Sequence, residues 1–257
     1  MNYNVHAFYY PWYGSEAVNG EWSHWNHLTL PHWTEAVNRQ YPQRQHQPPD
    51  DIAARFYPSL GPYSSTDPAV IEDHMKQLVE AGVGVLAISW YPPHSRDDSA
   101  LIFVDDFVPL ILDIAATYNE KVCFHIEPYK DRSAASVRND IVYIIDKYPL
   151  SFHSSCRYGS HPAFYRYQNK PLMYIYDSYI IPFSEWRTIF SPQGASTVSI
   201  TLFFSTSDSA VSSATSTTSF LNRTPKPISP PSATTSHQIF SPFYLSPQHM
   251  VFTFTFM

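Results

Sequence analysis

The chain has 257 residues, of which 44% are hydrophobic and 16% aromatic, so it can bury a sizeable core and is not disordered throughout. Its formal net charge is -6 and its Lys and Arg residues form no cluster, which argues against a nucleic-acid-binding surface. No apolar stretch approaches the roughly 18 residues of a membrane helix, and two cysteines are too few for a disulfide framework.

Apolar runs and helix-start signals alternate along the first 176 residues. Asp67 and Pro68 fit the N-cap and first position of a helix that Gly82 ends. The pattern predicts strands at residues 5–10, 83–90, 121–126 and 172–176, and amphipathic helices at 68–81, 108–118 and 133–148.

This regular alternation predicts an α/β fold with parallel strands and right-handed crossovers. Two architectures fit the order of the elements, a (β/α)₈ TIM-type barrel and an open doubly wound sheet. The glycine-rich phosphate loop of nucleotide-binding sheets is missing, because Gly14 has no Gly-x-Gly partner after the first strand. We therefore predict the barrel.

Barrel enzymes assemble their sites at the carboxyl ends of the strands. Tyrosine and tryptophan combine an apolar face with a hydrogen-bonding tip, which suits sugar recognition, although any one of them could equally be a packing residue at the rim. The ends carry Tyr9, Tyr10 and Trp12 after the first strand, Trp90 and Tyr91 after the second, His125 and Glu127 after the third, and Tyr176 and Asp177 after the fourth.

The long connection after the first strand contains His24 and His27. This pair has no third ligand at zinc-type spacing, so we predict no metal site. A connection of this length is usually functional or disordered, and its many aromatic residues favour order.

Six motifs in order resemble those of glycoside hydrolase family 99, the endo-α-1,2-mannosidase family, with closely matching spacing. The resemblance covers roughly residues 4–190 and implies about the first half of a (β/α)₈ catalytic barrel. The motifs are HAFYYPWYG (6–14), HWNH (24–27), PPDDI (48–52), SWYPP (89–93), FHIEPY (124–129) and YIYDSY (174–179).

The resemblance implies a Golgi enzyme that cleaves glucosylated mannose from high-mannose N-linked glycans. Family members are retaining and need neither metal nor cofactor, and an amino-terminal anchor that is missing from this sequence holds them in the membrane. A monomer is expected. Their mechanism is thought to use the substrate's own 2-hydroxyl as nucleophile, so it needs one carboxylate as base and another as acid.

That carboxylate pair belongs to an Asn-Glu-Trp-His-Glu-Gly motif, which does not occur in this sequence. Beyond Asp177 the remaining acids are Glu185 and Asp208, and neither restores the motif. The sequence therefore predicts no catalytic acid or base. Resemblance implies instead that Glu127 binds mannose hydroxyls and that Tyr91 contacts the terminal glucose, with the other strand-end residues lining the pocket.

We expect a division at residue 190, with a partial catalytic barrel at 1–190 and an irregular tail at 191–257. Nearly half of residues 191–237 are Ser or Thr, and four prolines interrupt the segment from 225 to 231. A shifted reading frame or retained intron would explain such a tail, and an O-glycosylated stalk is the rival explanation. The chain departs from the family pattern at a second place, where about ten extra residues, including 149–157, are inserted. We expect this insertion to form a surface loop.

Three functions stay open at this point. The first is endo-α-1,2-mannosidase activity as the family function, with little turnover by this chain itself. The second is a mannose- or glucosyl-mannose-binding protein without catalysis. The third is a truncated isoform that does not fold stably, because an open half barrel exposes apolar strand edges.

Overall fold

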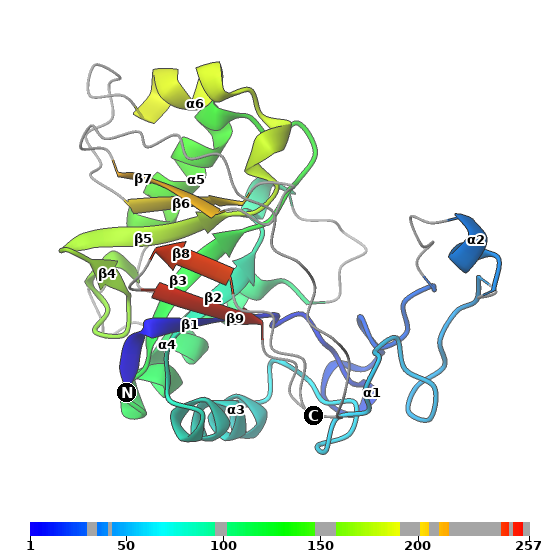
Figure 1. Ribbon diagram of the computed structural model, residues 1–257. Helices are drawn as coiled ribbons and strands as arrows, with labels where there is room; N and C mark the ends of the chain where they lie inside the picture. The colour runs from blue at the N-terminus through cyan, green and yellow to red at the C-terminus, as the bar shows by residue number, and fades with distance from the viewer. Residues whose placement is uncertain are drawn as a thin grey trace, which may run out of the picture.

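A computed structural model gives the structure of residues 1–29, 35–40, 43–95, 102–146, 158–190, 201–205, 211–215, 243–246 and 249–253. Strands and helices alternate through most of it, as predicted (Figure 1). The alternating elements are β1 (Asn2–Tyr9), α3 (Pro68–Glu80), β2 (Val83–Trp90), α4 (Val108–Thr117), β3 (Lys121–Ile126), α5 (Ala134–Asp146), β5 (Lys170–Ile175), α6 (Phe183–Phe190) and β6 (Thr201–Ser205).

The predicted bounds of β2 and β3 are confirmed, and β1 begins three residues earlier than expected. Helix α3 begins as its sequence indicates, because the Asp67 carboxylate accepts a hydrogen bond of 2.9 Å from the Ala69 amide. Its buried face carries Ile71, Met75 and Leu78. Gly82 then takes a left-handed conformation with φ of 74°, which glycine adopts without steric cost.

Strands β1, β2, β3, β5 and β6 lie side by side in chain order, and each neighbouring pair is parallel. A doubly wound sheet would reverse its strand order near the middle, whereas a barrel adds strands in sequence. Strand β9 (His249–Thr253) continues the sheet parallel to β1. The order of the strands therefore indicates part of a barrel.

The helices provide a second test of the architecture, because they cover only one face of the sheet. Leu86, Ile88 and Trp90 of β2 pack in the same hydrophobic cluster as buried residues of α3, α4, α5 and α6. Val85 and Ala87 belong to a separate cluster on the other face. Figure 1 shows these helices following one another around the outside of the sheet. A doubly wound sheet would carry helices on both faces, so the chain contains part of a (β/α)₈ barrel.

The inner face of the sheet is lined by aromatic and histidine side chains. The Tyr174 hydroxyl lies 2.8 Å from His6 Nδ1, which connects β5 to β1 across the interior. Nearby, the Tyr165 hydroxyl donates to the Tyr3 carbonyl at 3.1 Å, and its ring meets His6 edge to face. The interior of this part of the barrel is thus packed with polar aromatic groups.

The long connection between β1 and α3 is ordered where the structure describes it, as its aromatic residues indicate. Trp25 lies stacked on Tyr13 with 4.1 Å between ring centroids, and its indole donates to the Tyr63 carbonyl at 2.7 Å. The connection includes two short helices, α1 (Glu16–Asn19) and α2 (Glu35–Asn38).

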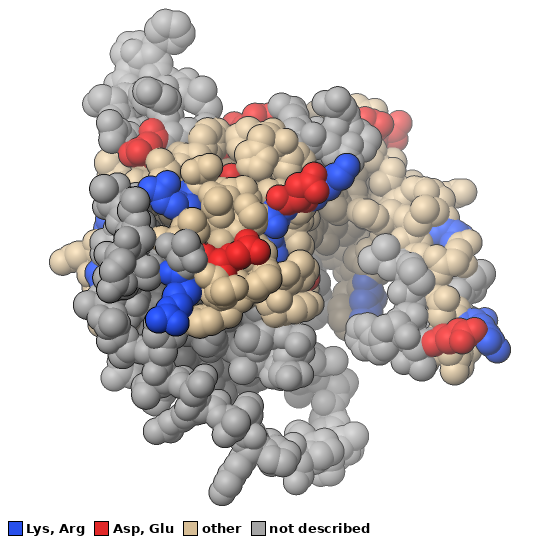
Figure 2. Space-filling view, turned by 90° about the horizontal axis from the view of Figure 1, so that it is seen from above, with Lys and Arg blue, Asp and Glu red and all other residues tan. Residues whose placement is uncertain are grey.

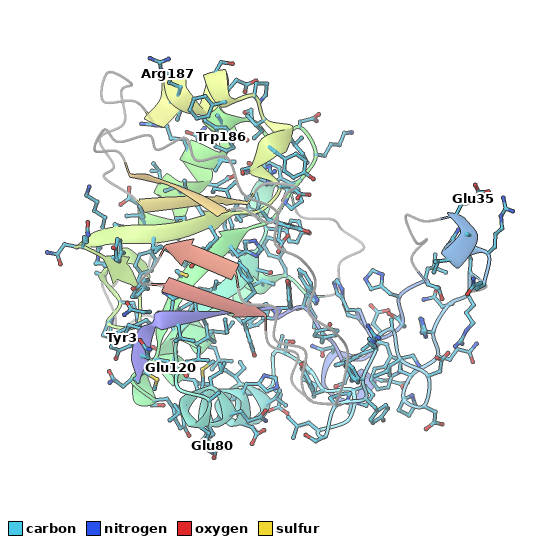
Figure 3. All side chains as sticks on the ribbon, viewed as in Figure 1. Tyr3, Glu35, Glu80, Glu120, Trp186 and Arg187 are labelled. Carbon is cyan, nitrogen blue, oxygen red and sulfur yellow. The ribbon has the colours of Figure 1, made fainter. Side chains whose placement is uncertain are left out.

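Further short elements complete the described chain. Strand β4 (Arg166–Tyr167) forms an antiparallel pair with β5, and 3-10 turns occur at Pro93–Ser95, Val104–Asp106, Tyr158–Ser160 and Ser178–Ile180. Helix α6, which the sequence pattern did not predict, is anchored by Trp186, whose indole donates to the Ser178 carbonyl at 3.1 Å. Figure 3 shows Arg187, the next residue, at the outer side of the same helix.

Four short strands of the expected tail are described. Two of them, β6 and β9, extend the sheet beside β5 and β1. Strand β7 (Val211–Thr215) pairs antiparallel with β6, and β8 (Phe243–Ser246) pairs antiparallel with β9. The insertion at 149–157 and the carboxylate of Asp208 lie outside the described residues. The division at residue 190 stays a prediction.

Charged side chains of the described residues are interspersed on the face shown in Figure 2, where Lys and Arg alternate with Asp and Glu. Helix α2 carries an exposed ion pair between Arg39 and Glu35. Such surface pairs contribute little to stability.

One carboxylate lies at the opposite end of the barrel from the strand-end residues. Glu120 directly precedes β3 and is fully buried, and neither of its oxygens has a hydrogen-bond partner among the described residues. Figure 3 places it beneath the sheet near Tyr3, whose hydroxyl donates to the adjacent Asn119 carbonyl at 2.8 Å. Burial raises the pKa of Glu120 to about 8.

We predict that Glu120 makes folding less favourable as the pH rises. Its pKa is higher in the folded chain than in the unfolded chain, so its contribution is fully present below about pH 4.5 and is lost as the pH rises through 8. Glu120→Gln should remove up to about 1.4 kcal/mol per pH unit from the slope of unfolding free energy against pH. Urea denaturation between pH 5 and 9 measures this slope. The control is Glu80→Gln on the outer side of α3, which should keep the wild-type slope (Figure 3); an unchanged slope in Glu120→Gln would contradict the prediction.

Candidate functional site

The carboxyl ends of four parallel strands bring the candidate residues into one layer. The Glu127 amide donates to the Trp90 carbonyl at 3.0 Å, and the Tyr176 amide donates to the Ile126 carbonyl at 3.1 Å. These bonds continue the sheet one residue beyond β3 and β5, so both side chains lie at the same end of the barrel. Tyr10 and Tyr91 follow the ends of β1 and β2 in the same way.

Glu127 is the central carboxylate of this layer, with only 4% of its surface exposed. Burial raises its pKa to about 7, and the negative charge of Asp177 acts in the same direction. The nearby Ser89 hydroxyl and the Arg132 guanidinium oppose this shift. Glu127 is therefore divided between its protonated and ionised forms near neutral pH.

His125 lies beside this carboxylate and is equally buried. Its Nδ1 is 3.4 Å from Glu127 Oε1, too long for a good hydrogen bond, and has no other partner among the described residues. Burial lowers the pKa of His125 to about 3, so the imidazole is neutral at physiological pH. A neutral imidazole and a carboxyl group, side by side and incompletely paired, can both hydrogen-bond a ligand hydroxyl.

Two tyrosines accompany Glu127. Burial, reinforced by the charge of Glu127, raises the pKa of both Tyr10 and Tyr91 to about 12. Both phenols therefore stay neutral and can donate or accept hydrogen bonds. Such groups combine an apolar ring with a polar tip, which matches the alternating C–H and O–H surfaces of a sugar.

Aromatic contacts extend the layer toward the first long connection. The rings of Tyr10 and Trp12 lie 4.9 Å apart, and His24 stacks on Trp12 at 4.9 Å with an interplanar angle of 12°. At the other side of the layer, Tyr176 contacts the His125 ring at 5.3 Å and is 43% exposed. The layer thus offers both buried polar groups and accessible aromatic surface.

Two of the nine predicted site residues lie elsewhere. The Tyr9 ring belongs to the helix-side cluster, and its hydroxyl lies 3.0 Å from His74 Nδ1. Trp90 is fully buried in the same cluster, and its indole donates to Asp105 Oδ1 at 2.9 Å. Alternate residues of a strand face opposite sides, so the neighbours of Tyr10 and Tyr91 point toward the helices. We correct these two assignments; the other seven stay predictions.

Three contributors to the layer were missed from the sequence. Phe8 packs against His125 at 4.5 Å, Ser89 lies close enough to lower the pKa of Glu127, and Arg132 donates to backbone carbonyls after β5. Reading every second residue of β1 and β2 would have found Phe8 and Ser89. Arg132 lies in the connection between β3 and α5, where no strand periodicity indicates which way its side chain points.

The histidine pair of the first long connection stays close together in the fold. His24 Nδ1 and His27 Nε2 lie 3.0 Å apart. Within the ranges that the structure describes, no three His, Cys, Asp or Glu residues are arranged to hold a metal ion.

Comparison with known proteins gives one family and several close relatives. Residues 1–206 match the family model of glycosyl hydrolase family 99. Glycoprotein endo-alpha-1,2-mannosidase from Mus musculus is 51% identical over 203 residues, which are 77% of this chain and 42% of the relative. Glycoprotein endo-alpha-1,2-mannosidase-like protein from Homo sapiens is 48% identical over 196 residues, which are 74% of this chain and 40% of the relative.

Among solved structures, the family 99 endo-alpha-mannosidase from Bacteroides thetaiotaomicron is similar, with 40% identity and a TM-score of 0.61. That similarity covers 76% of this chain and 51% of the bacterial chain. The chain spans about two fifths of the length of the curated relatives it matches. In the part that the structure describes, no helix is both long enough and apolar enough to cross a membrane.

The side chains of Trp90 and Tyr91 face opposite sides of the sheet, so substituting them should affect stability differently. Trp90→Phe removes the indole donor to Asp105, a buried carboxylate, and leaves a small void in the core. We expect the free energy of unfolding to fall by about 1–3 kcal/mol. Tyr91→Phe, the matched control, should change it little. Denaturant titration measures both variants, and equal stability of Trp90→Phe and wild type would contradict the assignment of Trp90 to the core.

Proposed function

Because this chain belongs to glycosyl hydrolase family 99, we propose that it binds glucosylated mannose of N-linked glycans and serves the hydrolysis of α-1,2-mannosidic bonds. The endo-alpha-1,2-mannosidase names of its relatives support this substrate class. The relatives also lead us to propose the Golgi as the place of action.

One observation carries the proposal: Glu127 and His125 form a buried, incompletely paired polar couple surrounded by neutral tyrosines at the strand ends. Sugar hydroxyls both donate and accept hydrogen bonds, so they match a carboxyl group beside a neutral imidazole. The aromatic rings of Tyr10, Tyr91 and Tyr176 would pack against the sugar's C–H surface.

We assign Glu127 to substrate binding rather than to proton transfer. Glycoside hydrolysis needs two carboxyl groups on opposite sides of the scissile bond, with separated pKa values. Among the described residues, Asp177 is the carboxylate whose charge acts on Glu127, and we assign it to the pocket lining. The 257-residue sequence contains no Asn-Glu-Trp-His-Glu-Gly motif, so we assign the acid and base to none of its residues.

A second candidate function is glucosyl-mannose binding without turnover. The same missing motif favours it, because the binding groups are present in the sequence without the motif that carries the acid and base. The two candidates differ in one assay: incubation of the purified chain with a glucosylated high-mannose glycan and measurement of released glucosyl-mannose. Release would support hydrolysis by residues of this chain, and binding without release would support the second candidate.

Replacing the central carboxylate tests the proposed binding site. Glu127→Gln keeps the shape but removes the charge, so we expect glucosyl-mannose affinity to fall by about tenfold or more. Because burial raises the pKa of Glu127 to about 7, wild-type affinity should increase as the pH rises through 7, and the variant should lose this dependence.

Isothermal titration calorimetry between pH 5.5 and 8.5 measures both effects. Glu185→Gln, which changes an exposed carboxylate on α6, is the matched control and should bind like wild type. Equal affinities and equal pH profiles for Glu127→Gln and the control would rule out the role proposed for Glu127.

A further inference from the structure

Arg132 adds side-chain hydrogen bonds just beyond the point where the paired strands β3 and β5 end. It lies in the connection between β3 and α5, and it donates to two consecutive carbonyls after β5. Nη1 is 2.7 Å from the Tyr176 carbonyl oxygen, and Nη2 is 2.8 Å from that of Asp177. Charge-assisted bonds of this length are among the stronger hydrogen bonds in proteins.

The segment that Arg132 holds has an uncommon backbone conformation. Asp177 is left-handed, with φ of 49° and ψ of 39°, which few residues other than glycine adopt. The Asp177 carbonyl also accepts a bond of 3.2 Å from the Ile180 amide, which begins the short 3-10 turn Ser178–Ile180. The Asp177 carbonyl therefore accepts hydrogen bonds from both the Ile180 amide and the Arg132 guanidinium.

The charge of Arg132 also acts on the candidate site. The guanidinium is partly buried and interacts electrostatically with Glu127, Asp177 and Tyr129. It lowers the pKa of Glu127, against the effect of burial. Its positive charge also lowers the pKa of the neighbouring His125. Arg132 thus affects both the geometry and the protonation of the strand-end layer.

We propose that Arg132 is a positioning residue, which clamps the Tyr176–Asp177 turn to the end of β3 and so fixes Tyr176 beside His125 and Glu127. The sugar-binding part of this inference rests on the proposed function. An arginine suits the task better than a lysine, because its planar fork reaches two carbonyls at once, whereas an ammonium group is a single point charge.

Two substitutions distinguish the effect of the two-pronged guanidinium contact from the effect of the positive charge of Arg132. Arg132→Lys keeps the positive charge but loses the two-pronged contact, and Arg132→Gln loses both. Lys130→Gln is the matched control, because it removes an exposed positive charge two residues away from Arg132. Glucosyl-mannose affinity, amide hydrogen exchange and the titration of Glu127 by carboxyl carbon NMR are measured for all four proteins.

We expect the Tyr176 and Ile180 amides to exchange about tenfold faster in both Arg132 variants, while the Ile88 amide in the core exchanges as in wild type. Affinity for glucosyl-mannose should fall about tenfold in both. The midpoint of the Glu127 titration should move upward in Arg132→Gln and stay near the wild-type value in Arg132→Lys. The control should match wild type in every measurement.

Wild-type exchange at Tyr176 and Ile180 in both variants would overturn the clamp. Faster exchange at Ile88 to the same extent would also overturn it, because the effect would then be global. Faster local exchange with unchanged affinity would overturn the link to sugar binding. If wild type itself binds no glucosyl-mannose, the proposed function fails, and the exchange and titration measurements still decide whether Arg132 clamps the turn.

Discussion

Each parallel strand directs alternate side chains to opposite faces of the sheet, and the helices α3 to α6 cover only one of these faces. Apolar residues are therefore required at every second position for packing, and the residues between them are left for the interior. Polar aromatic groups such as His6 and Tyr174 occupy these interior positions and bond to one another. At the carboxyl end of β3, the same alternation of side-chain direction places Glu127 and His125 in one layer.

Burial disfavours the charged form of both Glu127 and His125, although this moves their pKa values in opposite directions. It disfavours charge, so it raises the pKa of Glu127 and lowers that of His125. The result is a couple with little net charge at the lower end of the physiological pH range. Both groups can hydrogen-bond a neutral ligand rich in hydroxyl groups, and Glu127 becomes a stronger, charge-assisted acceptor as it ionises.

The sequence predicted the barrel and the positions of its main strands because hydrophobic periodicity and helix caps are local signals. It assigned Tyr9 and Trp90 to the wrong face, because adjacent aromatic residues at a strand end look alike until the strand register is known. Helix α6 was missed because it is short and is anchored by a bond from Trp186 to a backbone carbonyl, that of Ser178. Arg132 could not be found from sequence, since its partners lie 44 and 45 residues away and are backbone carbonyls, which no sequence pattern reveals.

The bond between Tyr174 and His6 has a consequence for how the chain folds. It joins residues 168 positions apart, so the chain must close a long loop before this contact forms. Neighbouring strand–helix–strand units have much shorter loops and should assemble first, and the interior contact between β5 and β1 comes late. Until then the polar aromatic interior faces water.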